Sequence, residues 1–424
     1  MKKLLTNIFT KKKKLNAKEM AFLEIKQTTK VSEIFKAISN YNDLSEIRFV
    51  GGCVRKILNN EKFNDIDLAT NINPDQVKKC LKNNNIKFYE TGIDHGTITA
   101  NIEEKNFEIT SLRKDVLTDG RRAVVEFTND WMQDAFRRDF TINSIYADLD
   151  GNLFDPHDGL QDLQNGIVKF IGDPEKRIKE DYLRILRYVR FFLNYSKKKH
   201  QLNIIKIIKQ NISGVINLSK ERLLDELKKL LLSKSFVNLS QDELSAEIIL
   251  LIFPQLKNIE IFRKLNKYSQ NLIQKKDFTF ILSLLIIDET DNSDYFLYKF
   301  NVSNETKKKI LFFKGIYSNT IKKETFSKKN LKKIFYYYGN SYLIDLIDFQ
   351  LFKSSRDIKK LIKLKEYFEN LEVPKFPVKA KTLMQKYNIK EGKELGKKLK
   401  YLENLWVENN FTISNKEVDK AISS

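Results

Sequence analysis

Residues 47–70, IRFVGGCVRKILNNEKFNDIDLAT, decide the fold of the first part of the chain. They are typical of a strand, a glycine pair, a helix and a second strand, at residues 47–50, 51–52, 53–59 and 65–68. Gly51 and Gly52 at such a junction let the backbone approach a triphosphate, to which the start of the helix offers free N–H groups. Arg55, on the same helix, is a candidate phosphate ligand. The stretch therefore predicts a nucleotide-binding turn between two strands.

Asp65 and Asp67 lie at alternate positions of the second predicted strand. Side chains at i and i+2 point to one face of a strand, so the two carboxylates converge while Ile66 and Leu68 face the core. Oxygen ligands at this spacing suit Mg²⁺, which also needs phosphate oxygens and water. An Asp-x-Asp pattern alone is more often a solvated strand end, but its order after the glycine turn favours a metal site.

The placement of glycine divides the chain. Most of the 14 glycines lie between Gly51 and Gly172, and few follow until residue 391. Turns of this density accompany strands and tight loops, so we expect an α+β first part and a helical remainder. Further strands are predicted in a hairpin, at residues 96–102 and 107–112, and at residues 124–127. A helix is predicted at residues 75–83, after the Asn73-Pro74 cap, and long amphipathic helices follow from residue 162.

Charge and cysteine content limit the function classes. The chain of 424 residues has 76 Lys and Arg against 55 Asp and Glu, a net charge of +21 that favours a polyanionic partner, nucleic acid or an acidic membrane. Cys53 and Cys80 are too few for a disulfide framework or a cysteine-rich zinc site. The longest apolar run is too short for a membrane span. We interpret the basic N-terminus as a disordered arm, and expect a cytoplasmic protein.

Residues 137–143, RRDFTIN, form a second group of polar residues with chemical interest. Two arginines followed by an aspartate are by default a surface salt-bridge cluster. The apolar Phe140 and Ile142 beside Asn143 instead favour a fixed, partly enclosed site, with Arg138, Asp139 and Asn143 as candidates for nucleotide binding.

Residues 180–190, EDYLRILRYVR, predict one amphipathic helix with Asp181, Arg184 and Arg187 on a stripe apart from its apolar face. One interpretation is an ion pair one turn apart, worth about 0.2–0.5 kcal/mol. The other is base recognition. Cytosine and adenine both present an amino donor next to an unprotonated ring nitrogen, and uracil and guanine present the reverse. A carboxylate and a guanidinium together would accept C and A, and would reject U and G by leaving buried groups unpaired.

Together these motifs closely resemble the class II tRNA nucleotidyltransferases, the CCA-adding enzymes of the DNA polymerase β superfamily, which also includes bacterial poly(A) polymerases. The motifs between residues 48 and 192 that carry the resemblance are, in order, GGCVR, DIDLAT, HGTIT, FEITSLR, DGRR, RRDFTINSIYAD and EDYLRILRYVRF. Beyond them, residues 377–406 are similar to the helical tail of bacterial members. One departure is Lys56, where the family usually has Asp, which puts the role of that position in doubt.

The resemblance implies an α+β polymerase-β-like head with a mixed sheet, followed by an all-α neck, body and tail. The expected boundaries are a basic extension at residues 1–24, the nucleotidyltransferase head at 25–160, a base-reading neck at 161–235, and a tRNA-binding body and tail at 236–424.

The resemblance also implies site residues. Asp65 and Asp67 would be ligands of two Mg²⁺ ions. Glu108, on the strand expected beside them, is a candidate third carboxylate, although a solvated strand position is the alternative. The expected nucleotide-binding residues are Gly51, Gly52, Arg55, Arg138, Asp139 and Asn143 in the head, with Asp181 and Arg184 as base readers and Arg187 and Arg190 in support.

The implied reaction is attack by the tRNA 3′-hydroxyl on the α-phosphorus of CTP or ATP, with release of pyrophosphate and without a template. A poly(A) polymerase, an enzyme adding only CC or only A, and a catalytically inactive basic RNA-binding module are the alternatives. The DGRR loop within residues 114–122 is intact and disfavours a CC-only enzyme. We predict no membrane partner and make no prediction of oligomeric state.

Overall fold

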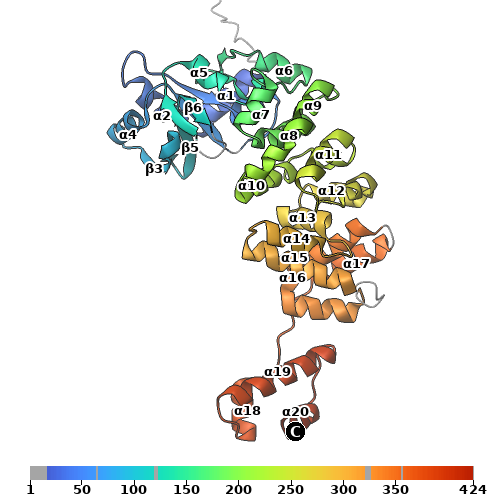
Figure 1. Ribbon diagram of the computed structural model, residues 1–424. Helices are drawn as coiled ribbons and strands as arrows, with labels where there is room; N and C mark the ends of the chain where they lie inside the picture. The colour runs from blue at the N-terminus through green and yellow to red at the C-terminus, as the bar shows by residue number, and fades with distance from the viewer. Residues whose placement is uncertain (1–16, 64, 119–122, 320–325, 355–356, 424) are drawn as a thin grey trace, which may run out of the picture. The chain divides into compact units, whose positions relative to one another are not determined.

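The computed structural model describes residues 17–63, 65–118, 123–319, 326–354 and 357–423. The chain divides into two compact units, the first ending at Leu227 and the second beginning at Lys228, within one helix. Figure 1 shows strands and helices together at the blue end of the chain and helices alone from green to red. The predicted α+β head followed by an all-α remainder is therefore confirmed. The predicted boundaries at residues 160 and 235 stay predictions.

The head is built on a mixed seven-stranded sheet in the order β3-β4-β5-β2-β1-β8-β9, accompanied by a separate two-stranded sheet β6-β7. Only β2 and β5 run parallel, and the other pairs are antiparallel. The strands are β1 (Ile47–Val50), β2 (Ile66–Thr70), β3 (Lys87–Gly92), β4 (Thr97–Ile102), β5 (Lys105–Ser111), β6 (Arg113–Thr118), β7 (Ala123–Phe127), β8 (Tyr146–Ala147) and β9 (Leu153–Phe154).

Helices surround the sheet and continue beyond it in the first unit. Its α-helices are α1 (Ala17–Thr28), α2 (Val31–Ser39), α3 (Gly52–Leu58), α4 (Pro74–Asn83), α5 (Trp131–Phe136), α6 (Gly159–Asn165), α7 (Pro174–Glu180), α8 (Leu183–Tyr195), α9 (Leu202–Asn211) and the start of α10 (Lys220–Leu231). Short 3₁₀ turns are η1 (Ile93–His95), η2 (Thr141–Asn143) and η3 (Ile212–Asn217).

Local sequence explains several of these elements. Asn73 caps α4 in a reciprocal capping box with Gln76, as the Asn73-Pro74 pair predicts. The predicted hairpin is confirmed as β4 and β5, but its turn is tighter than expected. Glu103 and Glu104 both have positive φ, the geometry that matches the twist of a two-residue hairpin.

Helix α1 corrects one prediction. It begins inside the predicted basic extension at residues 1–24, and its Phe22 and Ile25 side chains are buried. Phe22 packs against Phe49 of the central strand β1, with ring centroids 5.6 Å apart. Residues 17–24 therefore belong to the head, and the part of the prediction that covers them is wrong. Residues 1–16 lie outside the described part of the chain.

The second unit consists of helices and short 3₁₀ turns throughout its described residues. Its elements after α10 are η4 (Phe236–Ser240), α11 (Glu243–Ile252), η5 (Ile259–Lys264), α12 (Lys267–Ile273), α13 (Phe278–Ile286), α14 (Asn292–Lys299), α15 (Asn304–Asn319), α16 (Lys328–Lys353), α17 (Ile358–Glu369), α18 (Ala380–Tyr387), α19 (Lys393–Glu408) and α20 (Asn415–Ser423). Helix α16 is kinked at Gly339, whose φ of 83° suits glycine. Leu383, Leu395, Leu402 and Val418 form the core of the last three helices. In the described part of the chain no helix is both long and apolar enough to cross a membrane.

Candidate active site

Two carboxylates meet at the centre of the head sheet. Asp67 on β2 lies directly opposite Glu108 on the parallel strand β5, so both side chains leave the same face of the sheet. Asp65 immediately precedes β2, two residues from Asp67. The predicted neighbourhood of Glu108 and the Asp65–Asp67 pair is therefore present in the structure, and three acidic side chains gather there.

The electrostatics of this group fit a bound cation. Burial, together with the charges of Glu108 and Asp65, raises the pKa of Asp67 to about 6, against the lowering effect of Arg138 and Arg55. A cation between the carboxylates would relieve that repulsion. No three His, Cys, Asp or Glu side chains among the described residues are arranged to hold a metal ion by themselves. Carboxylate oxygens are the ligands of hard divalent ions, which also take oxygen ligands from phosphate and water.

The glycine turn lies against these groups. Gly51 has a φ of 70°, and a Cβ there would lie 3.7 Å from Arg138 Nη1 and 3.8 Å from Asp67 Oδ2. A Cβ on Gly52 would lie 3.8 Å from the same Asp67 oxygen and 3.9 Å from Arg55 Nη2. Because glycine has no side chain, the backbone of the turn stays accessible between the acidic Asp67 and the basic Arg55 and Arg138. The predicted nucleotide-binding turn requires such an accessible backbone.

Arg55 is more enclosed than a free phosphate ligand would be. Its guanidinium donates to the side-chain oxygen of Asn143. It also packs over the rings of Phe191 and Tyr195, at 4.8 Å and 5.0 Å from their centroids. The side chain is 6% exposed. Helix α3 thus carries Arg55 to a position fixed by the aromatic residues of α8.

Residues 137–143 form the enclosed site that Phe140 and Ile142 predict. Arg137 and Arg138 both pair with Asp134 of α5, and the hydroxyl of Tyr146 donates to the same carboxylate. Burial alone would raise the pKa of Asp134, but the two arginines and the tyrosine hold it well below its usual range. Arg138 is thereby fixed beside Gly51, and the default interpretation of a surface cluster is wrong.

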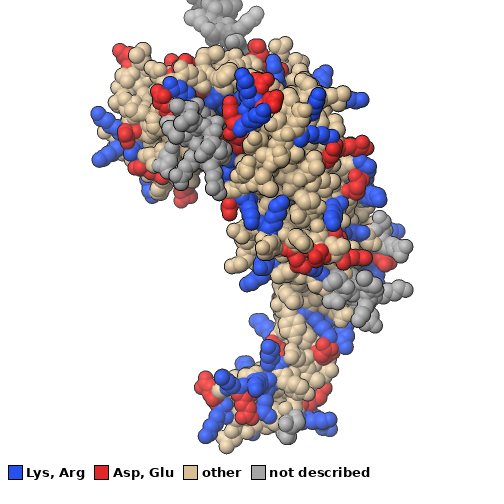
Figure 2. All heavy atoms as spheres, in the orientation of Figure 1, with Lys and Arg blue, Asp and Glu red and all other residues tan. Residues whose placement is uncertain are grey.

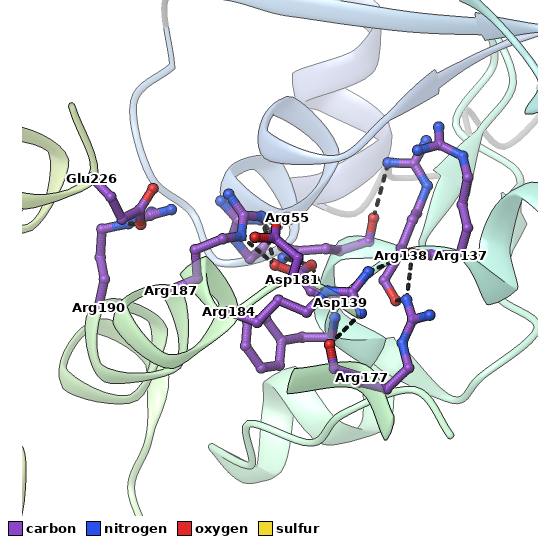
Figure 3. A network of polar contacts seen from close by, with 12 residues as sticks. Arg55, Arg137, Arg138, Asp139, Arg177, Asp181, Arg184, Arg187, Arg190 and Glu226 are labelled. Atoms are coloured by element: carbon purple, nitrogen blue, oxygen red, sulfur yellow. Dashed lines mark hydrogen bonds and ion pairs between the residues drawn. The ribbon is translucent and has the colours of Figure 1, made fainter. Parts of the chain in front are cut away.

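Asp139 joins the head to helix α8. It accepts hydrogen bonds from Arg187 Nε at 2.6 Å, from Asn143 at 2.8 Å and from the Phe140 backbone at 2.9 Å. Burial would raise the pKa of Asp139, yet Arg187 and these hydrogen bonds lower it to about 2. Arg55, Asn143, Asp139 and Arg187 therefore form one continuous chain of side-chain contacts. Figure 3 labels Arg55, Asp139 and Arg187 of this chain.

The predicted single helix over residues 180–190 is wrong at its start. Helix α7 ends at Glu180, Asp181 is extended with a φ of −154°, and α8 begins at Leu183. The carboxylate of Asp181 accepts the backbone N–H of Leu183 at 3.1 Å, so it satisfies a free donor at the start of α8. Its other oxygen accepts from Arg222 of α10 at 2.8 Å.

Arg184 also has a partner other than the predicted one. Its guanidinium donates to Glu180 at 2.6 Å and to the carbonyl of Arg177 at 2.7 Å. Asp181 and Arg184 thus pair with different residues, and the ion pair between them that the spacing allowed is not formed. The base-reading role of the two residues stays a prediction.

Arg190 completes the predicted set. It pairs with the buried Glu226 of α10 and packs over the ring of Phe191, 4.4 Å from its centroid. The structure therefore brings every predicted nucleotide-binding residue to the carboxylate cluster, the glycine turn or the network of Figure 3.

Several residues of the site were missed. Glu180 and Arg177 could have been found, because they stand four and seven positions before Arg184 in a helical pattern. Phe191 lies inside a motif already quoted. Asp134 could also have been found, because it stands three and four positions before Arg137 and Arg138. Glu226 gave no local signal, because its partner Arg190 lies on another helix.

Asp139→Asn is expected to lower the free energy of unfolding of the head by about 2–3 kcal/mol at pH 7, because the folded pKa of about 2 lies below the unfolded value of about 3.9. This stabilisation is present above about pH 4 and is lost as the pH falls through about 2. Urea titrations in a Trp406→Phe background would leave Trp131 of α5 as the reporter. The difference in the free energy of unfolding between wild type and variant should be smaller at pH 3 than at pH 7.

Asp150→Asn is the matched control, because Asp150 is 72% exposed and pairs only at the surface with Lys26. It should change stability by less than about 1 kcal/mol at either pH. An Asp139→Asn effect as small as that of the control would contradict the buried pairing.

Comparisons with known proteins agree with this geometry. Residues 47–169 match the family model described as the Poly A polymerase head domain. The chain is 36% identical over 419 residues to "CCA tRNA nucleotidyltransferase 1, mitochondrial" of Mus musculus, covering 96% of this chain and 92% of that protein. It is 34% identical over 322 residues to the "CCA-adding enzyme" of Staphylococcus haemolyticus, covering 74% and 75%.

Solved structures share the fold. The Bacillus stearothermophilus CCA-adding enzyme in complex with CTP is similar with a TM-score of 0.68 and 21% identity, over 92% of this chain and 95% of that chain. The Thermotoga maritima CCA-adding enzyme complexed with tRNA_CCA has a TM-score of 0.60 and 19% identity, over 93% and 95%.

Proposed function

Since the chain belongs to the CCA tRNA nucleotidyltransferases, we propose that the carboxylate cluster and the network of Figure 3 form its single nucleotidyl-transfer site. The enzyme adds C, C and A to the 3′ end of tRNA from CTP and ATP, without a template, and releases pyrophosphate. The observation that carries the assignment is the position of Asp67, opposite Glu108 and against the glycine turn.

The chain's own residues place the reactants. Asp65 and Asp67, with Glu108 as a third carboxylate, would hold divalent ions, which we propose to be two Mg²⁺. When bound, such ions lower the pKa of the attacking 3′-hydroxyl and stabilise charge on the leaving group. Gly51 and Gly52 leave room for the triphosphate, and Arg138, held by Asp134, directs positive charge at it. The site thus acts by placement and preorganised charge.

Base choice is assigned to the start of α8. Asp181 would accept from the amino group of C or A, and Arg184 would donate to the neighbouring ring nitrogen. Their partners Arg222 and Glu180 hold both side chains at this junction. Arg187 and Arg190 support them through contacts to Asp139, Glu226 and Phe191.

The tRNA is the polyanion that the net charge of +21 predicts as a partner. Figure 2 shows Lys and Arg side chains on both units in the view drawn, with Asp and Glu between them. We propose that the helical unit binds the acceptor and TΨC arms through phosphates and duplex shape.

Incubating tRNA that lacks CCA with CTP, ATP and Mg²⁺, and then sequencing the products, tests this function. We expect CCA ends. Runs of A would indicate a poly(A) polymerase, ends at CC or A alone would indicate a partial enzyme, and unchanged ends would indicate an inactive RNA-binding module. The structure places β6 and β7 on both sides of the DGRR loop, and residues 119–122 of that loop lie outside the described residues.

A cytoplasmic location is proposed on cysteine content and the N-terminal sequence alone. The mouse and human relatives are named as mitochondrial proteins. Fractionation of the source cells, followed by activity measurement, would decide between the two compartments.

A further inference from the structure

Arg177 of α7 joins the two halves of the site, although no motif assigned it a role. Its guanidinium donates to the backbone carbonyls of Arg137 and Arg138, the latter at 2.8 Å. Those carbonyls belong to the segment that carries Arg138 and Asp139. The Arg177 side chain is 7% exposed. A side chain of helix α7 therefore fixes the backbone of the nucleotide-binding segment (Figure 3).

The same guanidinium shares an acceptor with Arg184. Arg177 and Arg184 both donate to the Oε2 atom of Glu180. Arg184 also donates to the backbone carbonyl of Arg177 and, at 3.4 Å, to that of Arg137. Its orientation is thus determined by Glu180, by the α7 backbone and by a carbonyl that Arg177 binds as well.

We propose that Arg177 is a positioning residue for base selection, which acts through Glu180 and the Arg137 carbonyl to hold Arg184 in the orientation that admits C and A and rejects U and G. This inference rests on the proposed role of Arg184 in reading the base.

A fixed guanidinium is what makes rejection costly. U and G present a ring N–H where C and A present a lone pair, so a rigid donor leaves two donors facing each other. A donor that can turn away avoids that clash. Loosening Arg184 should therefore favour the wrong bases relative to the right ones, whereas a merely structural defect would lower the use of all four nucleotides together.

Arg177→Gln tests this by the kcat/KM values of CTP, ATP, UTP and GTP, measured with full-length enzyme on tRNA ending before and after CC. We expect UTP and GTP to gain about tenfold relative to CTP and ATP, the lower end of the discrimination carried by a bidentate base contact. Glu180→Gln should act in the same direction. The double variant should add little to either change, because both act through the same side chain.

Arg263→Gln is the matched control. Arg263 likewise pairs with a glutamate three positions away, Glu260, and donates to a backbone carbonyl, that of Ser240, but it lies in the second unit. Its ranking of the four nucleotides should equal that of the wild type. If Arg177→Gln does not fold, judged by its thermal unfolding transition, Arg177→Lys is scored by the same ratio, since lysine keeps the charge but not the forked geometry.

The possible outcomes distinguish the positioning role of Arg177 from the base-reading role of Arg184. An unchanged ranking in folded Arg177→Gln or Arg177→Lys, together with a changed ranking in Arg184→Gln, overturns the role of Arg177 alone. An unchanged ranking in Arg184→Gln as well overturns the base-reading assignment on which it rests. A raised share of UMP and GMP in both variants supports both.

Discussion

Asp67→Asn is expected to reduce transfer of both CMP and AMP by roughly a thousandfold or more. The substitution keeps the shape of the side chain but removes the charge that Asp67 contributes beside Glu108 and Asp65. Metal ions contribute several kcal/mol of transition-state stabilisation in such reactions, and each 1.36 kcal/mol is tenfold in rate. Single-turnover rates with CTP on tRNA lacking CCA, and with ATP on tRNA ending in CC, measure the loss.

The affinity for tRNA should stay within a few-fold of wild type, because we propose that the helical unit binds most of the tRNA. Asp75→Asn is the control, since Asp75 is an exposed residue of α4 that pairs with Lys78 at 2.9 Å. It should leave both rates nearly unchanged. Turnover by Asp67→Asn close to that of the control would refute the assignment of the metal ligands.

The affinity for tRNA should fall by roughly a thousandfold or more between about 50 and 200 mM salt, if six or more phosphates are contacted. The net charge of +21 and the lysines of the helical unit motivate this expectation. Each phosphate contact releases counterions, which makes the logarithm of the affinity linear in the logarithm of salt concentration. Filter binding or fluorescence anisotropy over this range gives the slope.

A triple variant tests whether lysines of α19 contribute to the salt dependence of tRNA affinity. Lys393, Lys397 and Lys400 are exposed on one face of α19, and replacing all three by Gln should make the slope shallower by up to about three units. Replacing the exposed head residues Lys36, Lys79 and Lys82 removes the same charge and should leave the slope nearly unchanged. A flat salt dependence in the wild type would mean that the lysines serve solubility only.

The local parts of the site could be predicted from the sequence. The strand carrying Asp67 and the glycine turn before it depend on neighbouring residues, and residue alternation placed Glu108 on the correct face. The capping box of α4 and the hairpin of β4 and β5 were equally local. Strand β3 was missed because it is polar and largely exposed, and β8 and β9 because two residues carry no periodic signal.

The remaining features depend on tertiary contacts. The helix breaks at Asp181, although the residues around it follow a good helical pattern. The carboxylate of Asp181 accepts from the backbone of Leu183 and from Arg222, which lies on a different helix. The packing of Arg55 over Phe191 and Tyr195 joins α3 to α8, which no spacing in the sequence reveals. The sequence thus predicted a set of site residues, while the structure was needed to show which partners hold them.

We propose that the protein itself reads the base through Asp181. The most direct test is the relative kcat/KM of CTP, ATP, UTP and GTP for Asp181→Ala, on tRNA ending in CC and on tRNA lacking CCA. Loss of the acceptor should reduce discrimination against UTP and GTP by about ten- to a hundredfold. Asp75→Ala removes an exposed carboxylate of α4 that pairs with Lys78, and should keep the wild-type order. An unchanged ranking of the four nucleotides in Asp181→Ala, even with lower overall activity, would contradict the claim.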